Sequence, residues 1–281
     1  MSSDLPLDIR TDRADYSPGE TVEVVITAGP ADKDLALGEV LVKLGHELEY
    51  DYSISADERS LSRTLKEPTT AAEERVSVDG TLAAGETAKW HLSFPVPDSP
   101  PGSAAGEIVT SRWFVAAHTP TTPGIDARSE AEIRVYIPRP AKADWPPRQG
   151  GYEDHRAKLE LSLAKTEGRP GDQLTGTFSV RPQESFGCTG IRVELEGHER
   201  VDLGDGKDWY VEGPRVELAP ASKLEPGHDL ELAFSLELPA DMTPTFETDA
   251  GSITCLVRAI VARRLRRDLT VEQPIYVYDY S

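Results

Sequence analysis

The chain has 281 residues, with 49 acidic and 30 basic side chains and a formal net charge of −19 at pH 7. This charge disfavours non-specific binding to nucleic acid and to anionic lipid, because both would be repelled. Hydrophobic residues make up 38% of the chain, which is too many for general disorder, and the 22 glycines and 22 prolines favour short strands joined by turns. The length suits about two domains, at ~100–200 residues each.

The first half of the chain predicts short strands. Apolar residues alternate with polar ones, as in half-buried strands, at residues 5–9, 22–26, 40–44, 76–80, 87–96, 108–117 and 132–137. Pro18-Gly19 predicts a turn before the second run, because proline fixes φ and glycine supplies freedom. The polar stretch after the third run has few apolar anchors, and we expect a short surface helix over residues 56–66.

Prolines and glycines mark a break in the middle of the chain. The prolines between residues 138 and 147 cannot donate to a sheet, and Gly150-Gly151 adds slack. We predict an N-terminal sandwich over residues 1–138, a linker over 139–155 and a C-terminal sandwich over 156–281. For Trp145 we favour a role in pinning the linker at the domain interface over a role as an exposed binding anchor.

The second half repeats the same order of runs. Its alternating segments are residues 159–163, 174–180, 191–195, 209–218, 230–238, 253–262 and 269–278. About seven short strands with frequent turns in each half are typical of an antiparallel sandwich. The predicted fold class is therefore all-β, with two tandem immunoglobulin-like antiparallel β-sandwiches.

Matching residues at fixed spacings indicate that the two halves are copies of one unit. Gly45-His46-Glu47 recurs as Gly197-His198-Glu199, 152 positions later, and Pro18-Gly19 recurs as Pro170-Gly171 at the same spacing. From residue 85 onward, the matching positions lie 142 apart. The drop of 10 predicts a longer middle loop in the first copy.

Several of these segments resemble those of arrestin-type domains. In the second half the resemblance rests on Arg169–Phe178, Gly190–Gly197, Phe234–Pro239, Pro244–Phe246 and Gly251–Ile253. A looser version in the first half covers Leu92–Pro97, Pro100-Pro101 and Gly106–Ile108. Nearly the whole chain is thereby similar to tandem arrestin-like N and C domains. Within that superfamily it looks most like the prokaryotic (bacterial) arrestin-like proteins, which include the sporulation-control group.

The resemblance implies a non-catalytic adaptor or scaffold without a cofactor. Such proteins bind protein partners through loops, the interdomain groove or a sheet edge. The chain also departs from the family. It has no Pro-Pro-x-Tyr segment to support a ubiquitin-ligase adaptor role, and no buried Arg–Asp polar core can be aligned, so phosphate sensing as in visual arrestins is not carried over. Cys255 stands where the family often has an aromatic residue.

Location and redox state follow from other signals. No apolar run is long enough to span a membrane. The first residues, Met1 to Pro6, lack the basic and apolar regions of a signal peptide. We therefore expect a cytoplasmic protein without a transmembrane segment. In that compartment Cys188 and Cys255 are expected to be separate core thiols rather than a disulfide.

Two segments carry the residue types that bind metals. The Gly-His-Glu repeats offer two ligand types, but neighbours on a strand point to opposite faces, and zinc needs about three or four converging ligands. We favour a strand-end role for these repeats. Asp202, Asp205 and Asp208 are spaced by threes, unlike the alternate ligands of an EF-hand calcium loop, so we favour a solvated turn. We predict no metal site.

A cluster of arginines is the strongest local anomaly in this acidic chain. It lies near the turn between the last two long strands, and the first copy has no equivalent. Its members are Arg258, Arg263, Arg264, Arg266 and Arg267. One interpretation is a hairpin tip that pairs with acids of its own chain, where such pairs add little stability. The other is a docking patch for an acidic partner, a phosphate group or an anionic membrane surface.

No recognisable catalytic arrangement stands out. The chain lacks a Gly-x-Ser-x-Gly elbow, a phosphate loop, a dinucleotide fingerprint and a His-Glu-x-x-His helix. Our first hypothesis is therefore the intracellular adaptor that binds proteins. The alternatives are a ligand- or metal-binding sandwich module and, less favoured, an enzyme or an enzyme's accessory subunit.

Overall fold

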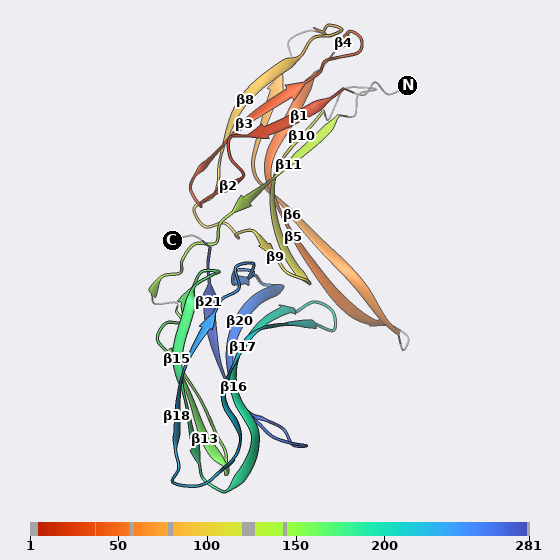
Figure 1. Ribbon diagram of the computed structural model, residues 1–281. Coiled ribbons are helices and arrows are strands. Elements are labelled where there is room, and N and C mark those ends of the chain that lie inside the picture. The colour runs from red at the N-terminus through yellow and green to blue at the C-terminus, as the bar shows by residue number, and fades with distance from the viewer. Residues whose placement is uncertain are drawn as a thin grey trace. The chain divides into compact units, whose positions relative to one another are not determined.

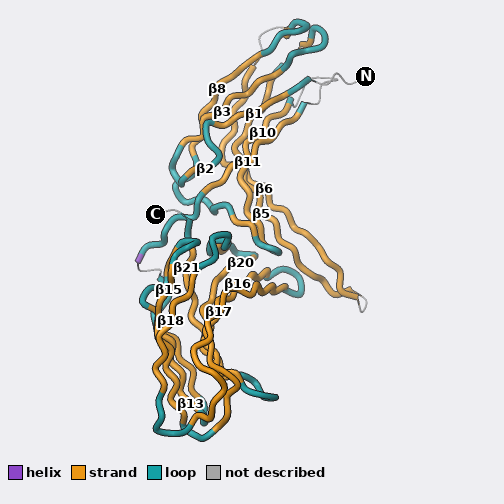
Figure 2. The backbone as a smooth tube through the Cα atoms, viewed as in Figure 1, coloured by secondary structure: helices purple, strands orange, loops and turns teal. Residues whose placement is uncertain are grey.

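The protein is an all-β chain in which strands are joined by loops (Figure 2). The structure is a computed structural model that describes residues 5–36, 38–56, 59–77, 81–119, 127–142 and 145–279. In that part of the chain, no helix has the length and hydropathy needed to cross a membrane. The predicted all-β class is confirmed.

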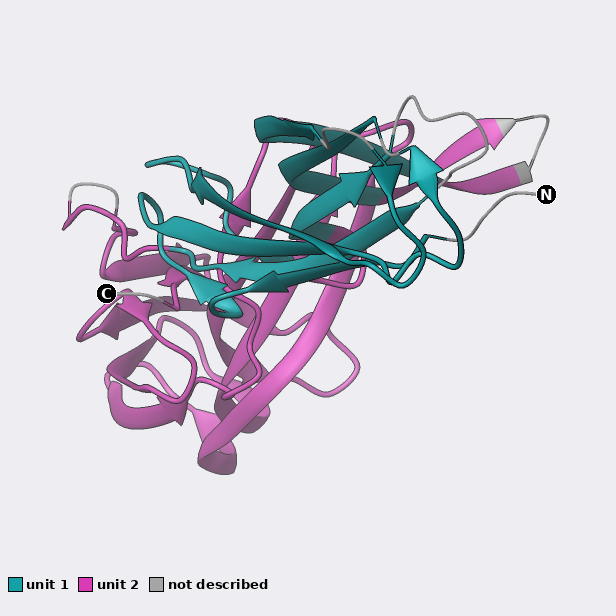
Figure 3. Ribbon diagram, turned by 90° about the horizontal axis from the view of Figure 1, so that it is seen from above, with its two compact units in different colours: residues 1–50, 64–105, 110–137 teal, residues 51–63, 106–109, 138–281 magenta. Residues whose placement is uncertain are grey.

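The chain forms two compact units (Figure 3). Unit 1 comprises residues 1–50, 64–105 and 110–137. Unit 2 comprises residues 138–281 together with the short segments 51–63 and 106–109. The domain limits 1–138, 139–155 and 156–281 stay a prediction.

Unit 1 is built from two main sheets and a short ribbon (Figure 1). The first sheet has the order β1 (Leu7–Thr11), β3 (Thr21–Ala28), β8 (Ala88–Pro95). The second has the order β2 (Asp15–Tyr16), β11 (Arg128–Val135), β10 (Val109–His118), β5 (Glu39–Ala56), β6 (Arg59–Ser77), and β9 (Ala104–Ala105) also pairs with β10. The ribbon pairs β4 (Leu35–Ala36) with β7 (Thr81–Leu82).

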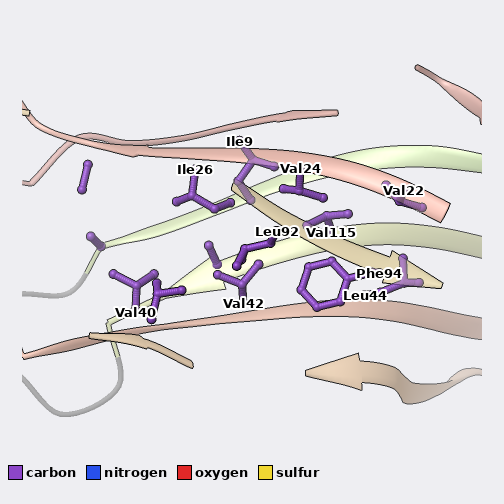
Figure 4. Packing of buried hydrophobic residues seen from close by; sticks show 14 of the residues in the cluster. Ile9, Val22, Val24, Ile26, Val40, Val42, Leu44, Leu92, Phe94 and Val115 are labelled. Atoms are coloured by element: carbon purple, nitrogen blue, oxygen red, sulfur yellow. The ribbon is translucent and has the colours of Figure 1, made fainter. Parts of the chain in front are cut away.

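Alternating apolar residues of both sheets form the core of unit 1. Val22, Val24 and Ile26 of β3 are buried, and so are Val42 and Leu44 of β5. These side chains point toward one another between the two sheets (Figure 4). Because successive residues of a strand face opposite sides, every second position supplies the core and the others face outward.

The segment predicted as a surface helix is a hairpin instead. β5 runs to Ala56 and β6 begins at Arg59, so the expectation of a helix over residues 56–66 was wrong. Lys66 of β6 reaches Glu47 and Glu49 of β5, at 3.4 and 2.5 Å. Cross-strand pairs of this kind stabilise a strand and override the weak local preference for a helix.

Unit 2 also has two main sheets. One has the order β12 (Gln149–Glu153), β13 (Ala157–Leu163), β15 (Gln173–Pro182), β18 (Leu230–Glu237). The other has the order β14 (Glu167–Gly168), β21 (Leu269–Val277), β20 (Gly251–Ala262), β16 (Phe186–Val201), β17 (Lys207–Leu224), and β19 (Phe246–Glu247) also pairs with β20.

The two units share one topology. The order β1-β3-β8 recurs as β13-β15-β18, and β2-β11-β10-β5-β6 recurs as β14-β21-β20-β16-β17. In both units a two-residue strand runs parallel to the last long strand, as β2 with β11 and β14 with β21. Each unit has its own hydrophobic core. The predicted pair of tandem β-sandwiches is confirmed.

The turns also repeat at the predicted spacings. Gly19 and Gly171 have φ of +78° and +87°, and Gly85 and Gly227 have φ of +83° and +84°. Glycine adopts these left-handed values without the steric penalty that a Cβ atom causes. The glycines that lie 152 or 142 positions apart therefore have the same backbone conformation.

An ion pair repeats beside the first of these turns. Arg13 lies 3.2 Å from Glu20, and Lys165 lies 3.0 Å from Asp172. Hydrogen bonds from the turn backbone, together with these cations, lower the pKa of both Glu20 and Asp172. The second copy has kept both the turn and the ion pair that accompanies it.

The Gly-His-Glu match, in contrast, is shifted by one residue. Three consecutive core positions of β5 and β16 lie 151 apart, since Val40, Val42 and Leu44 correspond to Ile191, Val193 and Leu195. The tripeptides at 152 therefore stand on opposite faces of their strands, because a one-residue slip exchanges the faces. His46 is buried whereas His198 is half-buried. The sequence identity is real, but the two segments are not structural equivalents.

Part of the predicted linker is structured. Gln149–Glu153 forms β12 and pairs with β13, so Gly150-Gly151 does not supply slack. A Cβ atom on Gly150 would lie 2.8 Å from the backbone oxygen of Glu272, so glycine there permits close packing on β21. Trp145 is half-buried and donates to the backbone oxygen of Pro140 at 3.1 Å. Trp145 is thus not an exposed binding anchor, which was the less favoured of the two interpretations.

Candidate functional site

Four of the five predicted arginines lie on the loop between β20 and β21. The two strands pair up to Val261 and Leu269, and the intervening residues form a projecting turn, dark blue in Figure 1. We call residues 263–267, with the sequence Arg-Arg-Leu-Arg-Arg, the arginine tip. The fifth arginine, Arg258, lies within β20 and has different surroundings.

Arg258 is engaged by acids of its own chain. Its guanidinium lies 3.6 Å from Glu194 and 3.1 Å from Glu272, and it also bonds Glu196. These carboxylates come from β16 and β21, which flank β20 in the sheet. Arg258 is therefore paired with acids of its own chain, as the first interpretation expects, and it is not free to bind a partner.

Arg263 closes the loop of the arginine tip. Its backbone N–H donates to Oδ1 of Asp268 at 2.8 Å, and its Nε donates to the backbone oxygen of Arg267 at 2.9 Å. This arrangement fixes the two ends of the tip. The guanidinium of Arg263 thus organises the turn.

Three arginines remain available to solvent. Arg264, Arg266 and Arg267 are exposed, and no acidic side chain among the described residues forms an ion pair with them. Arginine presents five donors in a rigid fork that fits a carboxylate or a phosphate with two parallel hydrogen bonds. The tip therefore offers three unpaired forks on one turn.

Leu265 lies at the apex between these arginines. It is 96% exposed and has a φ of +57°, the left-handed region that non-glycine residues rarely occupy. A side chain in this conformation costs about 1–2 kcal/mol. The turn thus presents a large apolar side chain to water, with arginines on both sides.

Further arginines surround a pocket next to the tip. A pocket of about 540 Å³ is lined by Arg263 and Arg267 of the tip and by Arg156, Arg192 and Arg258. Acidic residues line it as well, and Arg192 bonds Glu194 at 2.9 Å, which raises the pKa of Arg192. The pocket therefore joins a network of paired charges to Arg263 and Arg267 of the tip.

Sequence reasoning missed Arg156 and Arg192. Arg156 lies just before β13, and Arg192 lies on β16 directly opposite Ile260 of β20. Only the pairing of β16 with β20 brings Arg192 beside the tip. A correct strand register would have indicated this neighbour, but spacing along the chain would not.

The histidine of the first Gly-His-Glu segment has a structural role. His46 lies 2.9 Å from the hydroxyl of Ser111, which itself donates to the backbone oxygen of Gly102. The His46 ring packs against Trp113, with ring centres 5.0 Å apart. Burial lowers the pKa of His46 to about 4, so the side chain is neutral at pH 7.

The glutamate of the second segment is also satisfied internally. Glu199 is buried and accepts backbone N–H groups of Glu107 and Ile108, both at 2.8 Å. All these residues belong to unit 2. A carboxylate held by backbone donors is a structural anchor for the segment 106–109.

Two aspartates of the 202–208 turn, Asp202 and Asp208, bond an arginine and a histidine rather than one another. Asp202 bonds Arg200 at 2.6 Å, and Asp208 bonds His198 at 2.9 Å. Throughout the described chain, no three acidic, histidine or cysteine side chains converge as metal ligands would. Cys188 and Cys255 are separate buried thiols, as expected, and burial raises the pKa of Cys255.

The first copy matches a known protein family. Residues 2–140 match the family model described as arrestin (or S-antigen), C-terminal domain. The match lies in the half whose motifs are looser. No curated protein matches the chain. With the shared topology of the two units, the match supports the arrestin-type interpretation of the tandem sandwiches.

Proposed function

We propose that the protein is a non-catalytic adaptor that binds an acidic protein partner through the arginine tip. The observation that carries this proposal is the set of three exposed, unpaired arginines around the exposed Leu265. Arrestin domains are in general protein-binding domains, and residues 2–140 match one. A partner with a carboxylate-rich segment and an apolar side chain fits this tip best.

Charge distinguishes the candidate ligands of the tip. The chain as a whole carries −19, so an extended anionic surface such as a membrane is repelled by most of the molecule. A short acidic segment of a protein can reach the tip without approaching the rest of the surface. Local complementarity of this kind steers association and sets specificity.

We further propose that the protein acts in the cytoplasm and falls among the prokaryotic arrestin-like proteins, near the sporulation-control group. Two buried free cysteines support the reducing compartment, where disulfides are rare. The tandem copies support the family placement. Fractionation of the source cell would test the location directly.

Charge reversal of the tip tests the proposed function. We expect that changing Arg263, Arg264, Arg266 and Arg267 together to Glu abolishes capture of the acidic partner from a lysate of the source cell, as measured by mass spectrometry. The change removes the side-chain hydrogen bond of Arg263 to Arg267 but keeps its backbone bond to Asp268 on a surface turn, so the melting temperature should fall only slightly. Capture by the unaltered protein should weaken as salt rises, because ions screen exposed charges.

A matched variant separates the tip from net charge. Four exposed cations that are not part of the tip, changed together to Glu, alter the charge by the same amount; they are Lys33, Arg63, Lys89 and Lys158. This variant should capture the partner as the unaltered protein does. Equal capture by the tip variant and the unaltered protein would refute the proposal.

A further inference from the structure

A second surface of unit 2, at the edge of a sheet, suits ligands of the opposite charge to those that suit the arginine tip. β17 is the last strand of its sheet, and no described strand pairs with its other edge. Its second part carries Pro214 and Pro220, which blunt an edge because proline lacks an N–H donor. Its first part, Lys207–Gly213, has no proline, so its backbone groups remain available for pairing.

The two parts of β17 are separated by a bulge. Glu212 stands opposite Glu196 and Arg215 stands opposite Glu194, so two residues of β17 oppose Leu195. A bulge of this kind bends a strand and ends regular pairing. The open edge is therefore a defined segment of seven residues, 207–213, which we call the edge segment.

The edge segment exposes three consecutive large apolar residues. Trp209, Tyr210 and Val211 are 44%, 57% and 46% exposed. Native edges usually carry charges or proline at such places, and a long apolar edge that is left open is a site for pairing with another chain. The exposure of three neighbours in one short segment points to a surface that is covered by a partner.

The edge segment alternates in chemistry between its two faces. Trp209 and Val211 stand opposite Glu199 and Gly197, on the face that carries the core residue Leu195. Tyr210 stands opposite His198 on the other face, and their rings stack with centres 4.6 Å apart. Asp208 and Glu212 share the face of Tyr210 because strand side chains alternate. The apolar face thus carries Trp209 and Val211, with Lys207 at its N-terminal end, and the acidic face carries Asp208 and Glu212.

A pocket lies on the apolar face. It has a volume of about 290 Å³, and Val211 lines it with Leu195, Met242 and Ile253. Its lining also includes Glu212 and Asp241 but no lysine or arginine. The pocket can hold one apolar side chain, with acidic groups at its margin.

We propose that the edge segment binds an extended peptide as an added strand, with apolar side chains on the face of the pocket and lysine or arginine on the acidic face. Backbone hydrogen bonds would supply affinity, and alternate side chains would supply specificity, as in other strand-addition complexes. Opposite charges facing each other across paired strands stabilise the pairing. The site is independent of the arginine tip and selects the opposite charge.

Defined peptides test this proposal. Fluorescein-labelled Lys-Val-Lys-Val-Lys-Val-Lys should bind the full-length protein with an increase in anisotropy. The analogue with Glu in place of each Lys should bind at least tenfold more weakly because of like charge. A peptide of the same composition with four lysines followed by three valines should also lose at least tenfold, since it cannot alternate between the two faces.

Variants on the two faces of the edge segment locate the site. Val211→Ser should weaken binding of the Lys-Val peptide at least fivefold, whereas Tyr210→Ser, on the opposite face, should change it less than twofold. Glu212→Lys should shift the preference toward the Glu-Val peptide, which gives a readout that loss of folding cannot mimic. A melt of each variant checks that it is folded.

Three outcomes would overturn the proposal. One is equal binding of all three peptides, which would show non-specific adsorption. Another is an unchanged peptide preference in Glu212→Lys. The third is self-association of the unaltered protein in analytical ultracentrifugation that Val211→Ser removes, because the occupant of the edge would then be a second copy of the chain.

Discussion

The two buried polar residues of the Gly-His-Glu segments show how burial decides the role of a side chain. His46 lies in the core of unit 1 beside Ser111 and Trp113, whereas Glu199 accepts backbone N–H groups in unit 2. The two segments have the same sequence, but they are shifted by one residue relative to the core positions, so equivalent side chains face opposite sides of their strands. A residue's neighbours across the sheet, rather than its neighbours in sequence, fix its chemistry.

His46 predicts a specific pH dependence of stability. Its folded pKa is about 4, below the value of 6.5 for an exposed histidine. Above pH 6.5 neither the folded nor the unfolded state binds the proton. Between pH 6.5 and 4 the unfolded state binds it first, so stability falls by up to about 1.4 kcal/mol per pH unit from this group. Denaturant unfolding from pH 7 to 4 measures this loss.

Two variants test whether the burial of His46 causes that pH dependence of stability. His46→Gln should flatten the profile between pH 6.5 and 4, because glutamine does not titrate there. Ser111→Ala removes the hydrogen bond but leaves the ring buried, so it should keep most of the slope. A profile of His46→Gln that parallels the unaltered protein would show that other groups govern the acid response.

At the scale of elements, the turn between β20 and β21 contains one residue in a strained backbone conformation, and the cost of this strain can be measured. Leu265 has a left-handed φ of +57° and is 96% exposed, so its side chain contributes almost no burial. Leu265→Gly should therefore raise the free energy of unfolding by about 1 kcal/mol, since glycine adopts this conformation without a steric penalty. Leu265→Ala keeps the Cβ atom and should leave stability unchanged. A glycine variant less stable than the alanine variant would contradict this account of the turn.

Most of the long strands could be predicted from alternation, and the turns at Gly19 and Gly171 from their Pro-Gly pairs. The hairpin over residues 56–66 and β12 could not, because cross-strand partners distant in sequence decide them. The same limit applies to the site. The four arginines of the tip are adjacent in sequence, whereas Arg156 and Arg192 join them only through folding.

At the scale of the whole molecule, the chain carries two chemically opposite surfaces on unit 2. The arginine tip is cationic, and the edge segment is apolar on one face and acidic on the other. Under our two proposals, the adaptor would hold an acidic partner at the tip and a basic partner at the edge segment. The chain as a whole carries a net charge of −19, which disfavours other anionic ligands.

Photo-crosslinking from the apex of the tip tests the adaptor account most directly. A benzoylphenylalanine in place of Leu265 should give one discrete adduct with an acidic protein in the source cell. The adduct should disappear when the four tip arginines are changed to Glu and when lysate crosslinking is done at 1 M salt, where the screening length is about 3 Å. The same group in place of Leu61, which is also exposed, should not give this adduct. No adduct at position 265, or the same adduct from position 61, would contradict the account.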